Sequence, residues 1–322
     1  MTAPLDLRAQ TQGQQSGVSV PEPQTAVAAP LHAHVLDGNR LDWAALLHEA
    51  LTEPGRISAA FSVFHRYSIG NAFYLMLQAT LRGVDLSPVA SFKKWKELGR
   101  SVRKGEKAFE MVMPVLVKAK TKTAKGEKPA DEGAEIDEKT GKHTVFMLRR
   151  NWFLLSQTDA IPGAEQAEPE APRALDWNRS AALETLGIVE EAYSDIDGNC
   201  QGYAYRSTIA INPIAAHPLK TTFHEMAHIL LGHTLGEARM LDGATLARNV
   251  QEGEAESVAY LCCAALELPG AEESRGYIQK WLSDDAQTFE SRSAARVFAV
   301  ANKILKAGAP VESSQQSNGD EQ

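Results

Sequence analysis

Apolar residues recur at helical spacing over the first folded part of the chain. One short amphipathic pattern runs from Leu41 to Glu49, with Asp42 placed to cap its start. A longer pattern spans Ser58 to Leu81, and a third helix is expected from Ser91 to Gly99, ending at the glycine. Residues 41–99 are therefore predicted to form three helices.

Strand patterns follow these helices. Apolar and β-branched residues predict a strand from Phe109 to Val117, in which Pro114 indicates an edge or a bulge. The strand signal returns at Thr144–Leu148, and Trp152–Leu155 predicts another short strand. Between them, Lys118–Lys142 is a charged, low-complexity insertion, basic first and then acidic. This pattern predicts a β-hairpin with a long, flexible, solvated tip.

The second half of the chain is predicted to be mainly helical. A helix is expected near Ser180, and two strand signals lie close together at Gly202–Tyr205 and Thr208–Ile211. The remaining expected helices are one that begins at Thr221 or Thr222, one over Val250–Leu268, and two near Tyr277–Trp281 and Ser291–Lys306. The predicted fold class is α+β: N-terminal helices with a small antiparallel sheet, then a mainly helical domain with a short edge-strand sheet.

Composition divides the chain into two domains with tails. Residues 1–38, rich in Gln, Pro, Ala and Ser, and residues 310–322 are predicted to be disordered. A Pro/Ala/Glu-rich linker is expected at 161–175. The two domains are then expected at 39–160, with the flexible insertion at 118–142 inside it, and at 176–309.

The net charge of −8 conceals an uneven distribution. Residues 56–125 carry 14 Lys and Arg against 4 Asp and Glu, a local balance of +10. Residues 251–290 carry 9 acidic residues against 2 basic ones. A basic region attracts polyanions, while the acidic remainder argues against indiscriminate binding of nucleic acid by the whole molecule.

Cysteine content and hydropathy indicate the compartment. The three cysteines, two of them adjacent, form neither a disulfide framework nor a CxxC metal site, which fits a reducing cytosol. The N-terminal residues lack the apolar core of a secretory signal, and no apolar run of about 18 residues is present. We expect a cytoplasmic protein with no membrane partner.

The motif His224-Glu225-Met226-Ala227-His228 has the form HExxH. On a helix, positions i and i+4 share a face, so His224 and His228 can direct two imidazoles at one cation, for which Zn²⁺ is the expected cofactor. Glu225 is turned by about 100° from His224, which suits it to accept a proton from water rather than to bind the metal. These residues predict a hydrolytic zinc site with Glu225 as its catalytic base.

A third protein ligand is expected from the helix over 250–268. Glu252 and Glu256 fall on the face that carries its small and apolar residues, whereas Glu254 points elsewhere. Carboxylates on a buried face are costly unless they are paired or bind metal. We expect Glu252 to be the third ligand and Glu256 to hold a histidine ring, and the reverse assignment stays open. His233 is expected to cap the helix end or to pack near the site.

The basic segment combines cations with aromatic residues, as single-stranded nucleic acid requires for its backbone and its bases. Gly105 allows a tight turn that brings amide groups toward phosphate. Core packing of Trp95 and local capping by Asn71 are the alternatives to DNA contact. The residues expected to bind DNA are Tyr67, Asn71, Lys93, Lys94, Trp95, Lys96, Arg100, Arg103, Lys104 and Lys107.

Both halves resemble one family. The stretch TTFHEMAHILLGH (221–233) followed by QEGEAESVAYLCCAALEL (251–268) resembles the zincin-like metallopeptidase domain of ArdC-type antirestriction proteins and, more distantly, ImmA-like peptidases. RYSIGNAFYLMLQ (66–78) and SFKKWKELGRSVRKGEKAFEMVMPV (91–115) are similar to the ArdC domain that binds single-stranded DNA. The resemblance implies a gluzincin-like domain, in which the first acid of ExxxE is a ligand and the second its outer partner. Glu252 and Glu256 match that spacing.

Three functions are compatible with these features. The leading hypothesis is an antirestriction-type protein that coats entering single-stranded DNA and carries a zinc metallopeptidase-like domain acting on an unknown protein or peptide. The alternative is a metalloprotease, ImmA-like, that is targeted by DNA or cleaves a repressor. In the third, the zinc is only structural. Activity that depends on Glu225 separates these hypotheses.

Overall fold

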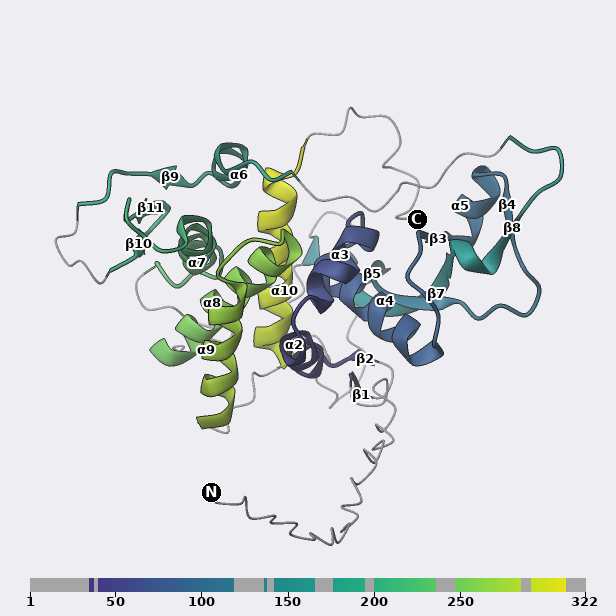
Figure 1. The fold of residues 1–322 in the computed structure, drawn as a ribbon, viewed down its shortest axis with the longest axis horizontal. Helices are drawn as coiled ribbons and strands as arrows, with labels where there is room; N and C mark the ends of the chain where they lie inside the picture. The colour runs from purple at the N-terminus through teal and green to yellow at the C-terminus, as the bar shows by residue number, and fades with distance from the viewer. Residues whose placement is uncertain are drawn as a thin grey trace, which may run out of the picture.

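Helices from both halves of the chain meet in the middle of the molecule, and small sheets lie at its two ends (Figure 1). This computed structural model describes residues 35–37, 40–118, 136–137, 142–165, 176–194, 200–235, 247–284 and 291–310 of the 322-residue chain. Most of the predicted tails, most of the charged insertion and most of the predicted linker lie outside these residues. Within the predicted N-terminal tail, Leu36–Asp37 form the strand β1, which pairs with β2 (Arg40–Leu41), so disorder up to residue 38 is wrong at this point. The mixture of helices and small sheets, antiparallel except for one parallel pair in the second half, is the α+β class that the sequence predicts.

The N-terminal helices are α2 (Trp43–Thr52), α3 (Arg56–Phe64) and α4 (Ile69–Arg82). The Asp42 side chain accepts hydrogen bonds from the first turn of α2, as predicted. The single helix predicted over 58–81 is wrong. The Ser68 hydroxyl caps a new helix by accepting from the Asn71 amide, so the chain turns between α3 and α4.

The N-terminal sheet has the order β3-β7-β5, built from β3 (Val89–Ser91), β7 (Lys142–Leu154) and β5 (Phe109–Lys118). All of these pairs are antiparallel, and the two-residue strand β6 (Ile136–Asp137) also pairs with β7. The return strand is continuous, whereas the sequence predicts two short strands there. The pairing of β5 with β7 shifts register between Phe109 and Glu110, which indicates a β-bulge at the start of β5.

Two amide side chains of α4 bond to the backbone of the edge strand β5. Asn71 donates to the Val112 carbonyl and accepts from its amide, both at 2.9 Å. Two helical turns later, Gln78 makes the same pair of 2.9 Å bonds with Glu110. These bonds satisfy backbone groups that an edge strand otherwise leaves unpaired. The pairing fixes α4 against the sheet.

A short unit follows β3 and returns after β7. It consists of α5 (Phe92–Glu97), β4 (Arg100–Val102), the 3-10 turn η1 (Leu155–Gln157) and β8 (Thr158–Ala160). The strands β4 and β8 pair antiparallel. The Ser91 hydroxyl caps α5, and the chain leaves it through Gly99 with a φ of 72°. The helix predicted over 91–99 is therefore present in a shorter form.

The second half combines helices with a three-stranded sheet of order β10-β11-β9, which packs mainly against α7. Its strands are β9 (Val189–Glu190), β10 (Gly202–Tyr205) and β11 (Thr208–Ile211). Its helices are α6 (Arg179–Leu186), α7 (Pro218–Leu230), α8 (Arg248–Ala265), α9 (Ala271–Asp284) and α10 (Ser291–Gly308). The predicted start of α7 at Thr221 or Thr222 is wrong: Pro218 occupies the first turn, where its missing N–H costs nothing.

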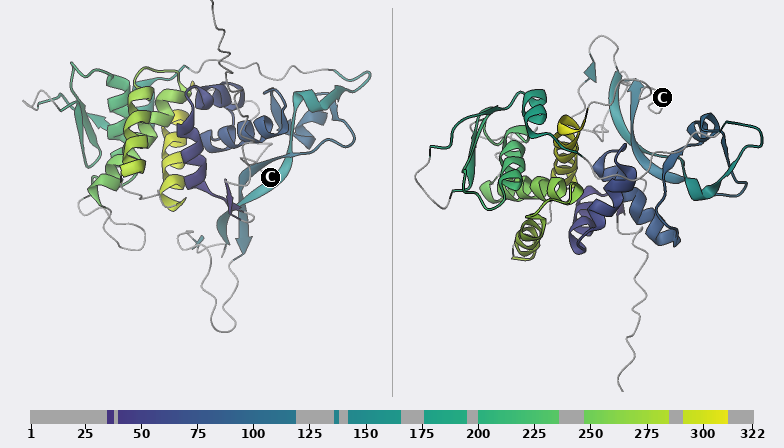
Figure 2. Two further views of the ribbon diagram at one scale, coloured as in Figure 1. Left: turned by 60° about the horizontal axis from the view of Figure 1, so that its bottom comes forward. Right: turned by 45° about the horizontal axis from the view of Figure 1, so that its top comes forward.

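Helix α10 lies between α8 and the N-terminal helices (Figure 2) and contacts α2, α4, α6, α7 and α8. The buried apolar residues of both halves accordingly form one continuous cluster. A hydrogen bond of 2.9 Å runs from the Tyr260 hydroxyl on α8 to the Ala50 carbonyl in the last turn of α2, where carbonyls lack helical partners. In the described part of the chain, no helix is both long and apolar enough to cross a bilayer.

Replacing Tyr260 with phenylalanine tests the contact between α8 and α2. The variant leaves the buried Ala50 carbonyl without its donor, so we expect the free energy of unfolding to fall by about 1–3 kcal/mol. Urea denaturation measures the change. The control is Tyr205→Phe, since Tyr205 is 61% exposed and should change stability by less than about 0.5 kcal/mol. Equal effects of the two substitutions would contradict the contact.

Candidate metal centre

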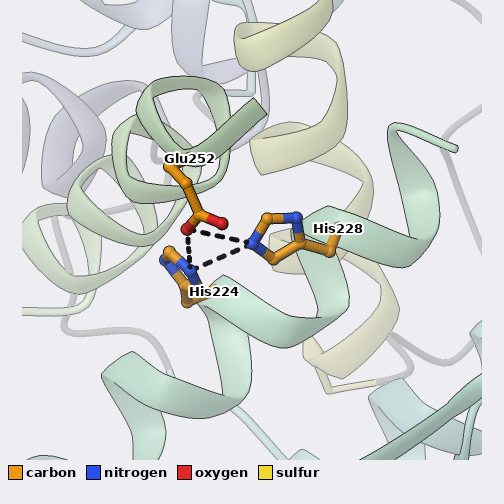
Figure 3. Close-up of side chains that lie close together, drawn as sticks. All are labelled: His224, His228 and Glu252. Atoms are coloured by element: carbon orange, nitrogen blue, oxygen red, sulfur yellow. Dashed lines mark hydrogen bonds and ion pairs between the residues drawn. The ribbon is translucent and has the colours of Figure 1, made fainter. Parts of the chain in front are cut away.

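Helix α7 carries the HExxH motif and presents both histidines to α8. The Nε2 atoms of His224 and His228 lie 3.1 Å apart. A carboxylate oxygen of Glu252 on α8 lies 3.4 Å from the first of these atoms and 3.6 Å from the second (Figure 3). Three potential ligand atoms from two helices therefore converge on one point.

The spacing of these atoms fits a tetrahedral metal ion. Metal–ligand bonds of about 2.0–2.1 Å at tetrahedral angles place neighbouring ligand atoms about 3.3–3.4 Å apart. The three separations of 3.1, 3.4 and 3.6 Å lie on either side of that value. Two imidazoles and one carboxylate are also the donor set of catalytic zinc sites, in which a fourth position stays open.

Glu256 lies one turn after Glu252 and bonds to the back of the first histidine. One of its oxygens is 3.0 Å from Nδ1 of His224, and the other is 2.8 Å from the ammonium of Lys220. Of the two acids, Glu252 therefore faces the ligand nitrogens and Glu256 holds a ring. These distances favour the predicted roles of the two acids over the reverse assignment.

These contacts also set the protonation of the cluster. Burial opposes charge on His224, but hydrogen bonds to Glu252 and Glu256 outweigh it and raise the pKa of the ring to about 9. Hydrogen bonds to the two histidines hold the pKa of Glu252 below its usual range. Burial works against ionisation of Glu256, yet its bonds to His224 and Lys220 lower its pKa to about 2. A metal ion that binds here must displace the proton from His224.

Glu225 stands beside the cluster and lines the same cavity. It is 7% exposed, and this burial raises its pKa above the usual value, partly offset by the neighbouring histidines. A carboxylate with a raised pKa is a better proton acceptor near neutral pH than an ordinary one. The chemistry that this position suits is general-base catalysis.

The cavity in front of the cluster has a volume of about 810 Å³. It is lined in part by Cys200 and by Gly202, Tyr203 and Ala204 of β10, an edge strand of its sheet. A Cβ on Gly202 would lie 2.8 Å from the Thr221 methyl group, so glycine permits β10 to approach α7 this closely. The open side of the site thus faces a strand edge.

Two residues behind the cluster have roles that the sequence does not predict. His233 is predicted only to cap the helix end or to pack near the site. Its Nδ1 atom lies 3.0 Å from Nδ1 of His228, and its Nε2 atom lies 2.9 Å from a carboxylate oxygen of Glu254. Glu254 does point away from the metal ligands, as predicted, and it is completely buried. The only sequence signal for the contact between His233 and Glu254 was a third acid, Glu254, in a helix rich in small and apolar residues. Tyr260, whose hydroxyl bonds to α2, does not line the cavity.

The predicted DNA-binding residues separate into exposed and buried groups. Lys93 and Lys96 on α5 are exposed, with the Lys96 ammonium 5.1 Å from the ring centre of Phe92, itself 40% exposed. Lys104 and Lys107 are exposed in the segment between β4 and β5, where Gly105 has a φ of 93°. These four lysines keep their predicted place on the surface.

Four further members of the predicted set bond within the protein but keep some exposure. Lys94 forms a 3.3 Å ion pair with Glu97, and the Tyr67 hydroxyl donates to the Val89 carbonyl. Arg100 bonds to Thr158 on β8. Arg103 bonds to Glu106, Asp159 and the Ser156 carbonyl. These side chains shape the surface around the exposed lysines.

Two of the predicted DNA contacts are wrong. Trp95 is fully buried, and its indole N–H donates to the Phe153 carbonyl at 2.8 Å. Asn71 uses both atoms of its amide to bond β5, as described above. For each residue the structure supports the alternative: Trp95 packs in the core and Asn71 makes an internal contact. Neither presents a surface to a base.

Comparison with known proteins places the first half of the chain. Residues 39–152 match the family described as the N-terminal domain of anti-restriction factor ArdC. An uncharacterized protein of Bacillus anthracis is 26% identical over 255 residues, which are 67% of this chain and 41% of that protein. The chain therefore spans about two fifths of the length of this relative.

Two solved structures are also similar at low identity. They are the crystal structures of the antirestriction protein ArdC from the R388 plasmid, one metal-free and one bound to Mn(II), both 22% identical to this chain. The metal-free structure has a TM-score of 0.43 and covers 83% of this chain and 94% of its own. The Mn(II)-bound structure has a TM-score of 0.44 and covers 84% and 99%. The family match covers residues 39–152, about a third of the chain.

Metal content is the direct test of the cluster. We expect the purified protein to retain about one Zn²⁺ per chain after dialysis, since two histidines and a glutamate converge with the spacing of a zinc site. His224→Ala should reduce this content to a small fraction, as measured by elemental analysis. His217→Ala is the matched control because His217 lies at the start of the same helix but outside the cluster. Unchanged zinc in His224→Ala would contradict the site.

Proposed function

Since residues 39–152 make this chain an ArdC-type protein of the anti-restriction family, we propose that it binds single-stranded DNA through its N-terminal half and hydrolyses peptide bonds in its C-terminal half. The observation that carries the hydrolytic part is the convergence of His224, His228 and Glu252 beside the buried Glu225 at an open cavity. The proposed cofactor is Zn²⁺.

In this proposal His224, His228 and Glu252 hold the ion, which when bound supplies a Lewis acid. Glu225 accepts a proton from water in the cavity and delivers it to the leaving amine, for which its raised pKa suits it. Glu256 and Lys220 keep the His224 ring in place. An extended peptide chain would lie along β10, the outer strand that walls the cavity.

An open cavity favours hydrolysis over a purely structural metal. Structural zinc sites are closed by four protein ligands, whereas the cluster has three and faces a space of about 810 Å³. A buried carboxylate beside the ligands has no function in a structural site and costs free energy there. The described residues therefore support a catalytic role.

The DNA-binding part is carried by the exposed lysines of α5 and of the β4–β5 segment. Lys93, Lys96, Lys104 and Lys107 supply cations for the phosphates. Phe92 adds an exposed aromatic face on the same helix. Contact through cations and a ring gives binding with little sequence preference, which suits the shielding of entering DNA of any sequence.

A second candidate makes proteolysis the main activity and DNA binding its means of targeting. The size of the cavity and the strand edge along it favour this version, because a protein segment fits both. The two candidates differ in whether protection of DNA from restriction depends on Glu225. If shielding by DNA binding is the main function, protection from restriction is independent of this residue.

Glu225→Gln tests hydrolysis and the choice between the candidates. The amide cannot accept the proton, so cleavage of a fluorogenic peptide library should fall by about 100- to 10,000-fold while zinc content is unchanged. Protection of DNA in a restriction assay should be unaffected. The control is Glu191→Gln, an exposed acid remote in sequence from the motif. Loss of protection would favour the protease, and full cleavage by Glu225→Gln would refute the assigned base.

Charge reversal tests the DNA-binding surface. For oligo-dT, a plot of log affinity against log salt should have a slope of about −0.7 per phosphate contact, and Lys93→Glu/Lys96→Glu should make it shallower by about 1.4. Fluorescence anisotropy measures both. Lys303→Glu/Lys306→Glu, which reverses two exposed lysines of α10, makes the same change in net charge. Equal losses of affinity in the two double variants would remove α5 from the interface.

A further inference from the structure

The second histidine of the cluster contacts a chain of buried polar groups on its side away from the cavity. Its Nε2 atom faces His224 and Glu252, while its Nδ1 atom lies 3.0 Å from Nδ1 of His233. The other nitrogen of His233 lies 2.9 Å from Glu254. The proposed ligand His228 is therefore connected to Glu254 of α8 through the side chain of His233.

The geometry assigns one direction to these hydrogen bonds. When Nε2 of His228 donates its lone pair to a metal ion, the proton of the neutral ring is on Nδ1. That N–H must donate to Nδ1 of His233, which then carries its own proton on Nε2 and donates it to the Glu254 carboxylate. Each of the two contacts in this series, His228 to His233 and His233 to Glu254, then has one proton and one acceptor.

Glu254 is fixed by a third helix. One of its oxygens accepts a short hydrogen bond from the Ser293 hydroxyl and lies 3.8 Å from the guanidinium of Arg296. The same guanidinium group donates to the Leu231 carbonyl at the end of α7. Glu254 has no exposed surface, and a buried carboxylate with such partners is held in one position. Residues of α10 thus hold the Glu254 side chain of α8 in place, and Arg296 of α10 also bonds to the end of α7.

We propose that His233 and Glu254 are positioning residues of the metal centre, which fix the tautomer and the orientation of His228 so that its Nε2 atom faces the ion. This inference rests on the proposed metal site. It also explains why three acids stand at alternate positions of α8. Glu252 faces the ion, Glu256 holds His224 directly, and Glu254 holds His228 through His233.

Two substitutions of similar size at position 233 isolate the contact. The side-chain oxygen of asparagine occupies nearly the place of Nδ1 in histidine, so His233→Asn keeps an acceptor for His228, whereas His233→Leu removes it. Each is combined with Glu254→Gln, so that neither leaves a buried charge unpaired. Glu254→Gln alone is the reference, and thermal unfolding confirms that each protein is folded.

Affinity for Zn²⁺ is measured by competition with a chromophoric chelator, and the visible spectrum of the Co²⁺-loaded protein reports the ligand geometry. Relative to the reference, His233→Leu/Glu254→Gln should bind zinc about 10- to 100-fold more weakly and show an altered Co²⁺ spectrum. His233→Asn/Glu254→Gln should recover most of both. A merely structural role predicts equal affinities for the leucine and asparagine variants, and that result would overturn the proposal.

A second measurement needs no variant. In the Zn²⁺-loaded wild-type protein labelled with ¹⁵N-histidine, NMR should find the proton of His228 on Nδ1 and that of His233 on Nε2; the opposite tautomers would overturn the proposal. Failure of the metal site gives a different result. If the wild-type protein binds no zinc, or if His228→Ala binds it as tightly, then the proposed function fails and the positioning role fails with it.

Discussion

The packing of α8 against α7 is the contact on which the proposed site depends. Helix α8 carries three carboxylates within five residues, and two of them, Glu254 and Glu256, are buried, which would be unfavourable without a partner. Glu252 and Glu256 meet the histidines of α7, while Glu254 turns toward α10. Each acid therefore requires a particular neighbouring helix, and only one arrangement of the three helices satisfies all of them.

This arrangement links the site to the rest of the molecule. Helix α10 anchors Glu254 and also packs against α2 and α4 of the N-terminal half. Tyr260 joins α8 to α2 from the same helix that carries the acids. A continuous apolar core surrounds these contacts. The proposed catalytic helix and the helices of the N-terminal half thus share one interior, so a change in either half affects the stability of both.

Local signals predicted most of the elements and all three of the proposed metal ligands. Helical spacing places His224 and His228 on one face, and the acids of α8 follow from the same geometry, so the cluster needs only that two helices meet. The cap at Ser68 was also a local signal, but the long apolar pattern from 58 to 81 concealed it. Trp95 shows the limit of composition: an aromatic residue among lysines suggests a nucleic-acid surface, yet its ring fills the core.

Contacts between distant segments could not be predicted. His233 and Glu254 meet only because α7, α8 and α10 pack together, and no spacing along the chain encodes their 2.9 Å bond. The bonds from Asn71 and Gln78 to β5 are of the same kind, since they depend on where the helix lies on the sheet. For both sets, a polar residue on an otherwise buried face was the only clue in the sequence.

The most direct test of the central claim is anomalous X-ray diffraction at the zinc edge from crystals grown with Zn²⁺. The account predicts one strong peak, about 2.0–2.2 Å from Nε2 of His224, Nε2 of His228 and a carboxylate oxygen of Glu252, with Glu256 bound to His224 and not to the ion. A peak coordinated by Glu256 in place of Glu252, or no peak between α7 and α8, would contradict it.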